Sequence, residues 1–184
     1  MKKVAISSLV GGVIIFLWQL LSYNLLHLHR DTQKYSPNQD SILKMLTENL
    51  SEEGQYLLPT LPAISTPKEQ QRLADAQEGR SWAVVSFHKN YTGDIIGKII
   101  IALLTNIVMV GMLAWIFSKM EGWGLFTFFV SSVFVGLIVF MNTSVTNRIW
   151  NESFGLTADL IDAVASWGLV GLWMGGYLGV KPKK

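Results

Sequence analysis

Four long apolar runs decide what this chain can fold into. They extend over Val4–Leu26, Ile95–Phe117, Leu125–Met141 and Leu160–Val180. A helix needs about 20 mainly apolar residues to cross a bilayer, whose hydrocarbon core is about 30 Å thick. Half of the 184 residues are hydrophobic and the mean hydropathy is +0.35, a balance that is rare in soluble domains. We therefore predict an all-α membrane protein with four transmembrane helices.

The first apolar run follows Met1, Lys2 and Lys3, which is also how a signal peptide begins. The run is longer than the apolar core of a signal peptide, and no cleavage site of small residues follows it. We expect an uncleaved transmembrane helix. The chain then divides into the first transmembrane helix over residues 1–26, a polar insert of mixed charge over 27–94, and a three-helix transmembrane region over 95–184.

Short elements are predicted within the insert. The apolar side chains of Ser41–Leu50 fall on one helical stripe, which predicts an amphipathic helix. Thr66 and Glu69 have the spacing of a capping box and predict the start of a second helix. Ser81–His88 is rich in residues that favour strands, and we expect it to pair with Tyr56–Leu58. The predicted fold is thus a four-helix membrane protein with a small mixed insert.

The distribution of lysine predicts the orientation. Lysine and arginine in short loops concentrate on the cytoplasmic side of a membrane. If the N-terminus is inside, the inside holds six lysines: Lys2, Lys3, Lys119, Lys181, Lys183 and Lys184. The turn between the third and fourth runs, on the other side, then holds only Arg148. We expect both termini to be cytoplasmic and residues 27–94 to be extracytoplasmic.

Glycines recur at every fourth position near the end of the chain, at Gly171, Gly175 and Gly179. Such a stripe is flat and allows another helix to approach closely. The helix that packs on it belongs either to this chain or to another protein. Because short turns join the second, third and fourth runs, we expect these three helices to be antiparallel neighbours.

Three charged residues lie near the ends of the apolar runs. Asp159 and Asp162 are one helical turn apart at the start of the fourth run. Carboxylates inside a bilayer are costly and often mark proton or cation paths. Alternatively, they stabilise the positive end of the helix dipole, with Thr157 as the helix cap. Lys98 either extends to the membrane surface or forms an ion pair with one of the aspartates.

The chain has three histidines, His27, His29 and His88, and no cysteine. If they converged at the outer surface, the histidines could bind a metal or haem. Neither a cysteine nor a pair of histidines one helical turn apart supports such a site. We predict no metal, no cofactor and no catalytic residue. The net charge of +2 gives no indication of a nucleic-acid partner.

The turn between the third and fourth runs combines Arg148 and Trp150 with other bulky residues. Tryptophan and arginine dominate the energetics of protein interfaces. We therefore interpret Arg148 and Trp150 as a contact surface, either for the outer insert of this chain or for another protein.

Two short motifs stand out in the sequence: the segment Tyr56–Pro59, and Ile149, Trp150 and Phe154 followed by Asp159. Through these motifs the chain resembles a group of small uncharacterised bacterial inner-membrane proteins. Those proteins have an N-terminal anchor, an outer insert and three closely spaced helices. The resemblance implies this topology and a bacterial inner membrane, and it implies no activity.

We expect a non-catalytic integral membrane protein that contacts the lipid bilayer and other membrane protein subunits. Its expected role is that of an accessory or scaffold subunit of a larger inner-membrane complex. The first alternative is a small proton- or ion-coupled carrier or channel that uses Asp159, Asp162 and Lys98. The second alternative is a membrane haem or metal protein that uses the histidines of the outer surface.

Overall fold

The computed structural model describes residues 2–179, which form two compact units. The four-helix unit joins the chain up to Lys34 to the chain from Asp94 onward, and the insert unit is Tyr35–Gly93. Residues 27–34, which the sequence placed in the insert, are therefore grouped with the helices. The end of the fourth apolar run at Val180 and the lysines at 181, 183 and 184 lie outside the described residues.

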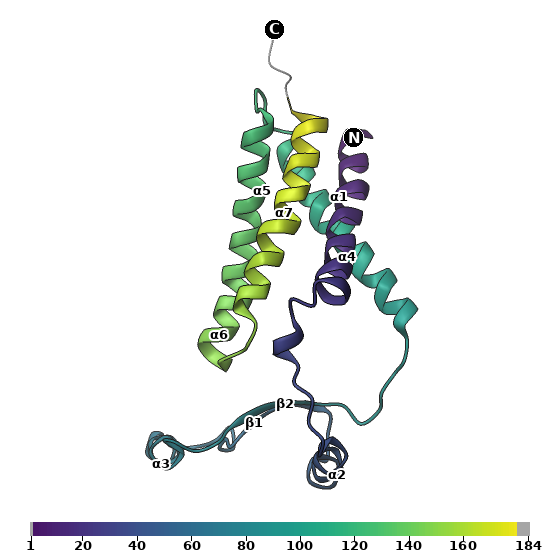
Figure 1. The fold of residues 1–184 in the computed structure, drawn as a ribbon. Helices are drawn as coiled ribbons and strands as arrows, with labels where there is room; N and C mark the ends of the chain where they lie inside the picture. The colour runs from purple at the N-terminus through teal and green to yellow at the C-terminus, as the bar shows by residue number, and fades with distance from the viewer. Residues whose placement is uncertain (1, 180–184) are drawn as a thin grey trace. The chain divides into compact units, whose positions relative to one another are not determined.

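The helices of the four-helix unit correspond to the four apolar runs (Figure 1). They are α1 (Lys2–Leu20) with a π-helical turn (Leu21–Leu25), α4 (Ile95–Phe117), α5 (Leu125–Phe140) continuing through a second π-helical turn (Met141–Val145) into α6 (Thr146–Asn151), and α7 (Leu156–Leu178). In the part of the chain that the structure describes, four helical stretches are long and apolar enough to cross a membrane. The predicted helical fold with four candidate spans is confirmed at this level.

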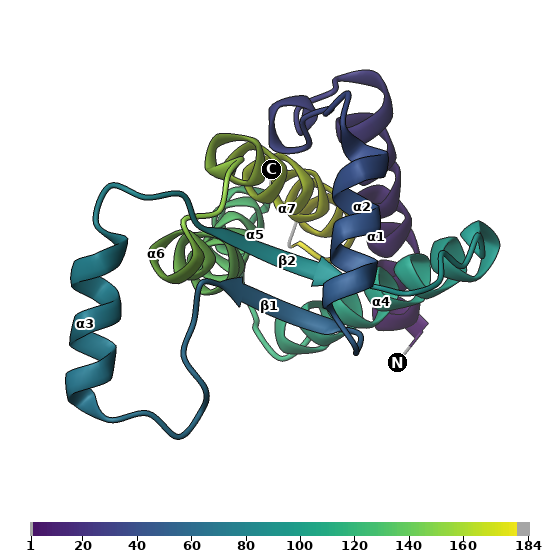
Figure 2. The same ribbon diagram turned by 90° about the horizontal axis from the view of Figure 1, so that it is seen from below.

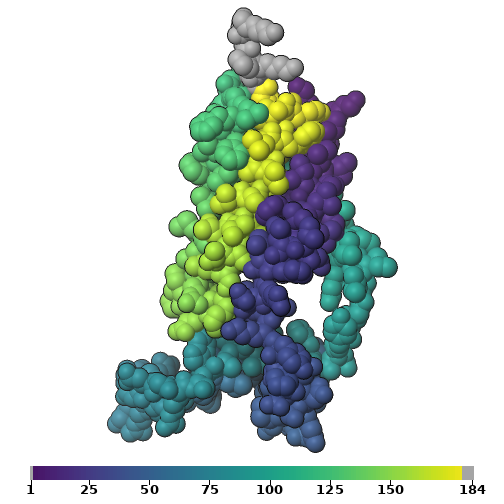
Figure 3. Space-filling model, in the orientation of Figure 1, coloured from purple at the N-terminus to yellow at the C-terminus, as the bar shows by residue number. Residues whose placement is uncertain are grey.

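Helix α7 lies between α5 and α1 (Figure 3). Helix α1 packs along both α7 and α4, whereas α5 packs along α7. The order across the bundle is therefore α4, α1, α7, α5. The expectation that the last three helices are neighbours holds for α5 and α7, but the main packing partner of α4 is α1. The short turn joins α4 to α5 without making them the closest pair.

Small residues explain why α4 packs on α1. A Cβ atom added to Gly12 would lie 2.6 Å from the Cα of Ile107, so the two backbones approach as closely as glycine permits. The hydroxyl of Ser8 donates a hydrogen bond of 2.6 Å to the carbonyl oxygen of Ile107. The Nδ2 of the adjacent Asn106 donates to the Oε1 of Gln19, further along α1, over 2.9 Å. Close packing and hydrogen bonds between helices are the main sources of association in lipid.

The glycines of α7 contact α5. A Cβ atom on Gly171 would lie 2.8 Å from the Cα of Phe129, and one on Gly175 would lie 2.9 Å from the Cα of Leu125. On the facing helix, a Cβ on Gly136 would lie 2.6 Å from the carbonyl oxygen of Ala163. Gly179 caps α7, and a Cβ there would meet the carbonyl of Gly175 in its own helix. Gly171 and Gly175 therefore pack on a helix of this chain.

A compact hydrophobic core lies among these helices. Val110 of α4 and Val170 and Met174 of α7 are fully buried. The rings of Phe117 and Phe128 meet edge to face, with centroids 4.9 Å apart, where α4 ends and α5 begins. The remaining residues of the core are Ile15, Leu113, Ala114 and Trp167.

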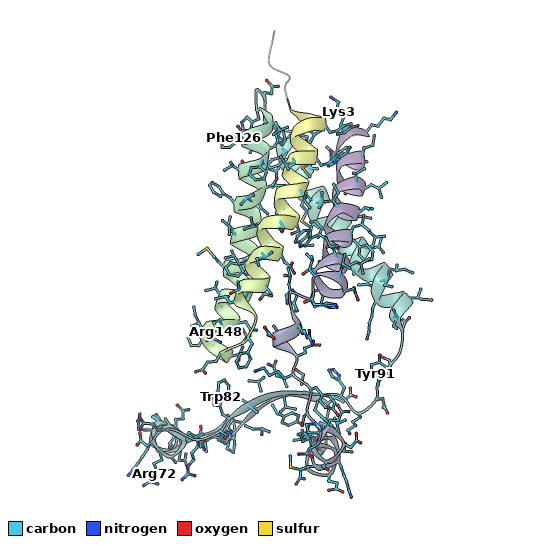
Figure 4. All side chains as sticks on the ribbon, viewed as in Figure 1. Lys3, Arg72, Trp82, Tyr91, Phe126 and Arg148 are labelled. Atoms are coloured by element: carbon cyan, nitrogen blue, oxygen red, sulfur yellow. The ribbon has the colours of Figure 1, made fainter. Side chains whose placement is uncertain are left out.

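The two ends of the bundle differ in charge. Lys2, Lys3 and Lys119 border one pocket of about 570 Å³ together with Leu178. We call this the lysine end; Figure 4 shows Lys3 there and Arg148 at the opposite end. The opposite end, where α1 finishes and α7 starts, contains Asp162 and is called the aspartate end.

The insert unit contains a two-stranded antiparallel sheet (Figure 2). Strands β1 (Gly54–Leu58) and β2 (Ala83–Phe87) pair as the sequence predicted. The predicted helices are also present as α2 (Gln39–Asn49) and α3 (Pro67–Gln77), and α3 begins with the predicted capping box.

Candidate functional site

A histidine beyond the end of α1 contacts two carboxylates at the start of α7. The Nε2 of His29 lies 2.8 Å from the Oδ2 of Asp162, and its Nδ1 lies 3.8 Å from the Oδ1 of Asp159. An ionised carboxylate only accepts hydrogen bonds, so the imidazole donates to Asp162. The side chains of His29 and Asp162 are only 10% and 21% exposed. The contact is an ion pair when the imidazole is protonated.

The backbone turns back after α1 and thereby places His29 against α7. The π-helical turn Leu21–Leu25 ends the helix, and His27 follows with a φ of 50°, which is uncommon for a residue other than glycine. The amide of Leu28 donates to the carbonyl of Ser22 over 3.1 Å. The hydroxyl of Thr32 donates to the carbonyl of His29 over 2.6 Å. These local hydrogen bonds hold the turn in place.

Each oxygen of the Asp162 carboxylate has its own donor. The indole Nε1 of Trp18 donates to Oδ1 over 3.0 Å, while His29 occupies Oδ2. The ring of Tyr23 stacks on His29 with a centroid distance of 4.2 Å and an interplanar angle of 9°. The hydroxyl of Ser166 donates to the backbone carbonyl of Asp162 over 2.6 Å. Two side chains of the segment 18–29 thus contact one carboxylate of α7, and a third, Tyr23, packs on one of them.

This cluster borders a cavity of about 430 Å³ between the helices. Its walls come from α1, α4, α5 and α7, and the residues that line it are Ile15, Trp18, Gln19, Tyr23, His29, Met109, Val139, Phe140, Thr143, Ser144, Asp159, Asp162, Ala163, Ser166 and Trp167. Among these described residues there is no lysine or arginine. With both carboxylates ionised, two negative charges face a single imidazole. The lining therefore keeps a net negative charge even when His29 is protonated.

Both π-helical turns of the four-helix unit contribute to the cavity. Tyr23 belongs to Leu21–Leu25, and Thr143 and Ser144 belong to Met141–Val145. Single π turns inside α-helices occur frequently at functional sites, since they change the direction of side chains at the cost of a regular hydrogen bond. Their presence on two helices that face the same cavity makes this region the candidate functional site.

The predicted charged residues have different positions in the structure. Asp159 and Asp162 both face His29, an arrangement that the sequence analysis missed. Lys98 lies exposed one turn into α4, and its ion pair with an aspartate stays a prediction. The predicted cap by Thr157 is wrong: Gly155 precedes α7 with a φ of 91°, and no side chain caps the helix. This left-handed backbone conformation suits glycine.

The turn at the aspartate end also contains the predicted contact residues. The guanidinium of Arg148 donates to the backbone carbonyls of Glu152 and Ser153 over 3.2 and 2.8 Å, which closes the last turn of α6. Trp150 is 78% exposed, and its neighbours Ile149 and Phe154 are 66% and 77% exposed. Arg148 therefore holds the turn, while the three apolar side chains form an exposed group that we call the apolar tip.

The three histidines belong to two different units of the chain. His27 and His29 belong to the four-helix unit, whereas His88 follows β2 in the insert unit. Within residues 2–179, no group of three His, Cys, Asp or Glu side chains is arranged to hold a metal ion. The indole of Trp18 and the ring of Tyr23 gave no separate signal in the sequence, because aromatic residues are common near the ends of membrane helices.

No protein-family model, curated protein or solved structure matches this chain. The fold and the site by themselves define a class: a helical protein with four candidate membrane spans around a negatively charged cavity.

Proposed function

We propose that this protein is a small proton- or ion-coupled carrier or channel of a bacterial inner membrane. The observation that supports this proposal is the contact of Asp162 with His29 at the cavity between the spans. Ionisable side chains within membrane bundles are costly to bury and commonly serve ion or proton movement. Histidine and aspartate together provide a donor and an acceptor between which a proton can be taken up and released.

Asp162 is the residue on which this function depends. Both of its oxygens are occupied by donors from the segment 18–29, so a change in its protonation alters the contact between α1 and α7. Asp159 lies one turn nearer the helix start and has the longer contact with His29. In this mechanism, binding of a cation at the cavity competes with His29 for the carboxylates.

Proteoliposomes that contain a trapped pH-sensitive dye test the proposal. A membrane potential, or a gradient of K⁺, Na⁺ or methylammonium, should change the internal pH through the protein. Asp162→Asn should abolish this response, because the amide cannot carry the proton or the negative charge. Asp75→Asn, a matched change on the exposed α3 helix, should behave as the unchanged protein. Equal responses from the Asp162 variant and the unchanged protein would exclude the function.

The proposed orientation has both termini in the cytoplasm and residues 27–94 outside. Lys2, Lys3 and Lys119 gather at one end of the bundle, which supports a cytoplasmic position for that end. The chain has no cysteine, so single cysteines can be introduced and labelled. In intact cells, an impermeant maleimide should label Asn151→Cys and leave Glu121→Cys unlabelled. The reverse labelling pattern would show that the orientation in the membrane is opposite to the proposed one.

A second candidate function is that of an accessory or scaffold subunit of a larger membrane complex. The apolar tip of Ile149, Trp150 and Phe154 supports it, because aromatic side chains of this kind are enriched at protein interfaces. The glycines of α7 do not add support, since α5 covers Gly171 and Gly175.

Purification from native membranes in a mild detergent tests this second function. The chain should migrate with partners, well above the size expected for 20.6 kDa. The double variant Trp150→Ala and Phe154→Ala should lose those partners. Phe126→Ala is the matched control, because Phe126 is 74% exposed at the lysine end of the bundle. Recovery of the lone chain would count against an accessory role.

A further inference from the structure

We infer that the cavity at Asp162 binds an organic cation, meaning an amine or onium ion with an apolar or aromatic body. This inference rests on the proposed function in one respect only, which is that it uses the same cavity. Two properties of the cavity carry it: the unbalanced negative charge of its lining and the aromatic character of its walls.

The negative charge of the lining favours a positively charged ligand. Asp159 and Asp162 are both part of the lining, and both carboxylates contact His29. Asp162 has a donor on each oxygen, whereas the contact of Asp159 with Nδ1 of His29 is 3.8 Å and longer than a hydrogen bond. The carboxylate of Asp159 therefore keeps accepting capacity. A carboxylate in poorly polar surroundings attracts a cation more strongly than it would in water.

The aromatic walls select for the body of the ligand. The rings of Trp18, Tyr23, Phe140 and Trp167 line the cavity, which has a volume of about 430 Å³. Aromatic faces attract cations through their ring quadrupoles, and cages of such rings are a general means of binding quaternary ammonium groups. A volume of this size lies within the range of small-molecule sites, about 300–1,000 Å³. A bare metal ion would leave most of it unfilled.

A pair of probes that differ in charge tests the inference. Tetraphenylphosphonium and tetraphenylborate have nearly the same size and shape and opposite charges. Binding of each to the full-length protein in a non-ionic detergent is followed by calorimetry and by quenching of tryptophan fluorescence. We expect saturable binding of the cation and none of the anion. Equal binding of both ions would overturn the inference, since it would indicate partition into apolar surface.

Variants show whether the bound cation occupies this cavity. Asp162→Asn and Asp159→Asn should each weaken cation binding by about tenfold or more, because each removes a charge from the lining. Tyr23→Leu should weaken it by a smaller factor, about fivefold, through loss of a ring. Asp75→Asn should leave the affinity unchanged. Asp159→Asn serves as the decisive variant if Asp162→Asn fails to fold, and an unchanged affinity in a folded Asp159 variant would refute the site.

The two proposals can fail independently. Cation binding that depends on Asp159, together with an unchanged proton response in proteoliposomes, would leave a binding protein that is no carrier. A proton response that depends on Asp162, together with equal binding of the two probes, would leave a proton pathway without an organic-cation site.

Discussion

Helix α7 has two packing interfaces of different character. Its interface with α5 is built on Gly171 and Gly175, whose missing side chains allow the backbones to touch. Its interface with α1 combines the buried core, where Ile15 and Val170 belong to one cluster, with a polar part at Asp162, which accepts hydrogen bonds from Trp18 and His29 and borders a cavity. The first interface is stabilised by dense packing over its length, and the second by packing in the core together with a few hydrogen bonds beside the cavity.

This difference divides the bundle into two close pairs of helices. Gly12 brings α1 against α4 in the same way that Gly171 brings α7 against α5. The contacts of Asp162 with Trp18 and His29, which we call the polar interface, join one pair to the other together with the buried core. Substitutions at the glycines should therefore act on stability alone, whereas substitutions at Asp162 should change both stability and function.

The largest effect on the free energy of unfolding is expected at the interface of α7 with α5, which is built on glycines. Gly171→Leu forces a side chain against the backbone of Phe129 and should lower the free energy of unfolding by about 3 kcal/mol, the upper part of the range for overpacking. Unfolding by a denaturing detergent, followed by circular dichroism, measures the change. Gly176→Leu is the control, because no atom lies within 4 Å of an added Cβ there. Similar losses for both variants would mean that the interface is assigned wrongly.

Substitutions in the polar interface should lower the free energy of unfolding by a smaller amount. The effects of substituting two of its residues should also be coupled. Asp162→Asn should lower the free energy of unfolding by about 1–3 kcal/mol, because it weakens a partly buried contact with His29. With His29→Gln and the double variant, a double-mutant cycle should give a coupling energy of about 1 kcal/mol. Strictly additive losses would show that the two side chains do not interact in the folded protein.

A hydrogen bond between the two helices of a close pair should contribute less to the free energy of unfolding than the contact of Asp162 with His29. Asn106→Leu removes the hydrogen bond to Gln19 and should cost about 0.6 kcal/mol, the average for such bonds between membrane helices. The same unfolding assay applies, with Asn151→Leu on the exposed α6 helix as the comparison. A loss as large as that of Gly171→Leu would contradict the ranking of the two kinds of contact.

The smallest effect on stability is expected in the insert unit, at the start of α3. The carboxylate of Glu69 accepts a hydrogen bond from the backbone N–H of Thr66, which has the larger effect, and another from the Thr66 hydroxyl. Both bonds lower the pKa of the Glu69 carboxyl. The cap is therefore complete above the ordinary pKa of a glutamate and is lost as the pH falls through the lowered pKa. The amide signal of Thr66 in the full-length protein should follow this titration. In Glu69→Gln the amide should not respond to pH over that interval.

The sequence predicted the parts of the fold that depend on hydropathy and local chemistry. The run Ile95–Phe117 became α4 with the same bounds, because a long apolar run determines such a helix and Asp94 caps its start. The capping box at Thr66 and the pairing of β1 with β2 depend on near neighbours in sequence or on strand propensity. The order of the helices was harder, since small residues at Gly12 and at Gly171 look equivalent until their partners are known.

The site was only half predictable for a similar reason. Asp162 was visible as a charge in an apolar run, and Lys98 was the nearest cation at the expected depth. In the structure His29 contacts Asp162, and it reaches Asp162 because the backbone turns back at His27. That reversal depends on a positive φ at a residue other than glycine, for which the composition of the segment gives no signal.

The π-helical turn of Met141–Val145 has a consequence for reading this sequence on a helical wheel. One extra residue within a turn shifts everything after it by about 100° relative to an uninterrupted α-helix. A single wheel drawn over Leu125–Asn151 would therefore assign Arg148 and Trp150 to the wrong side. Deletion of one residue from 141–145 would remove the bulge and restore a regular α-helix, and the apolar tip would keep the direction that it has in the structure.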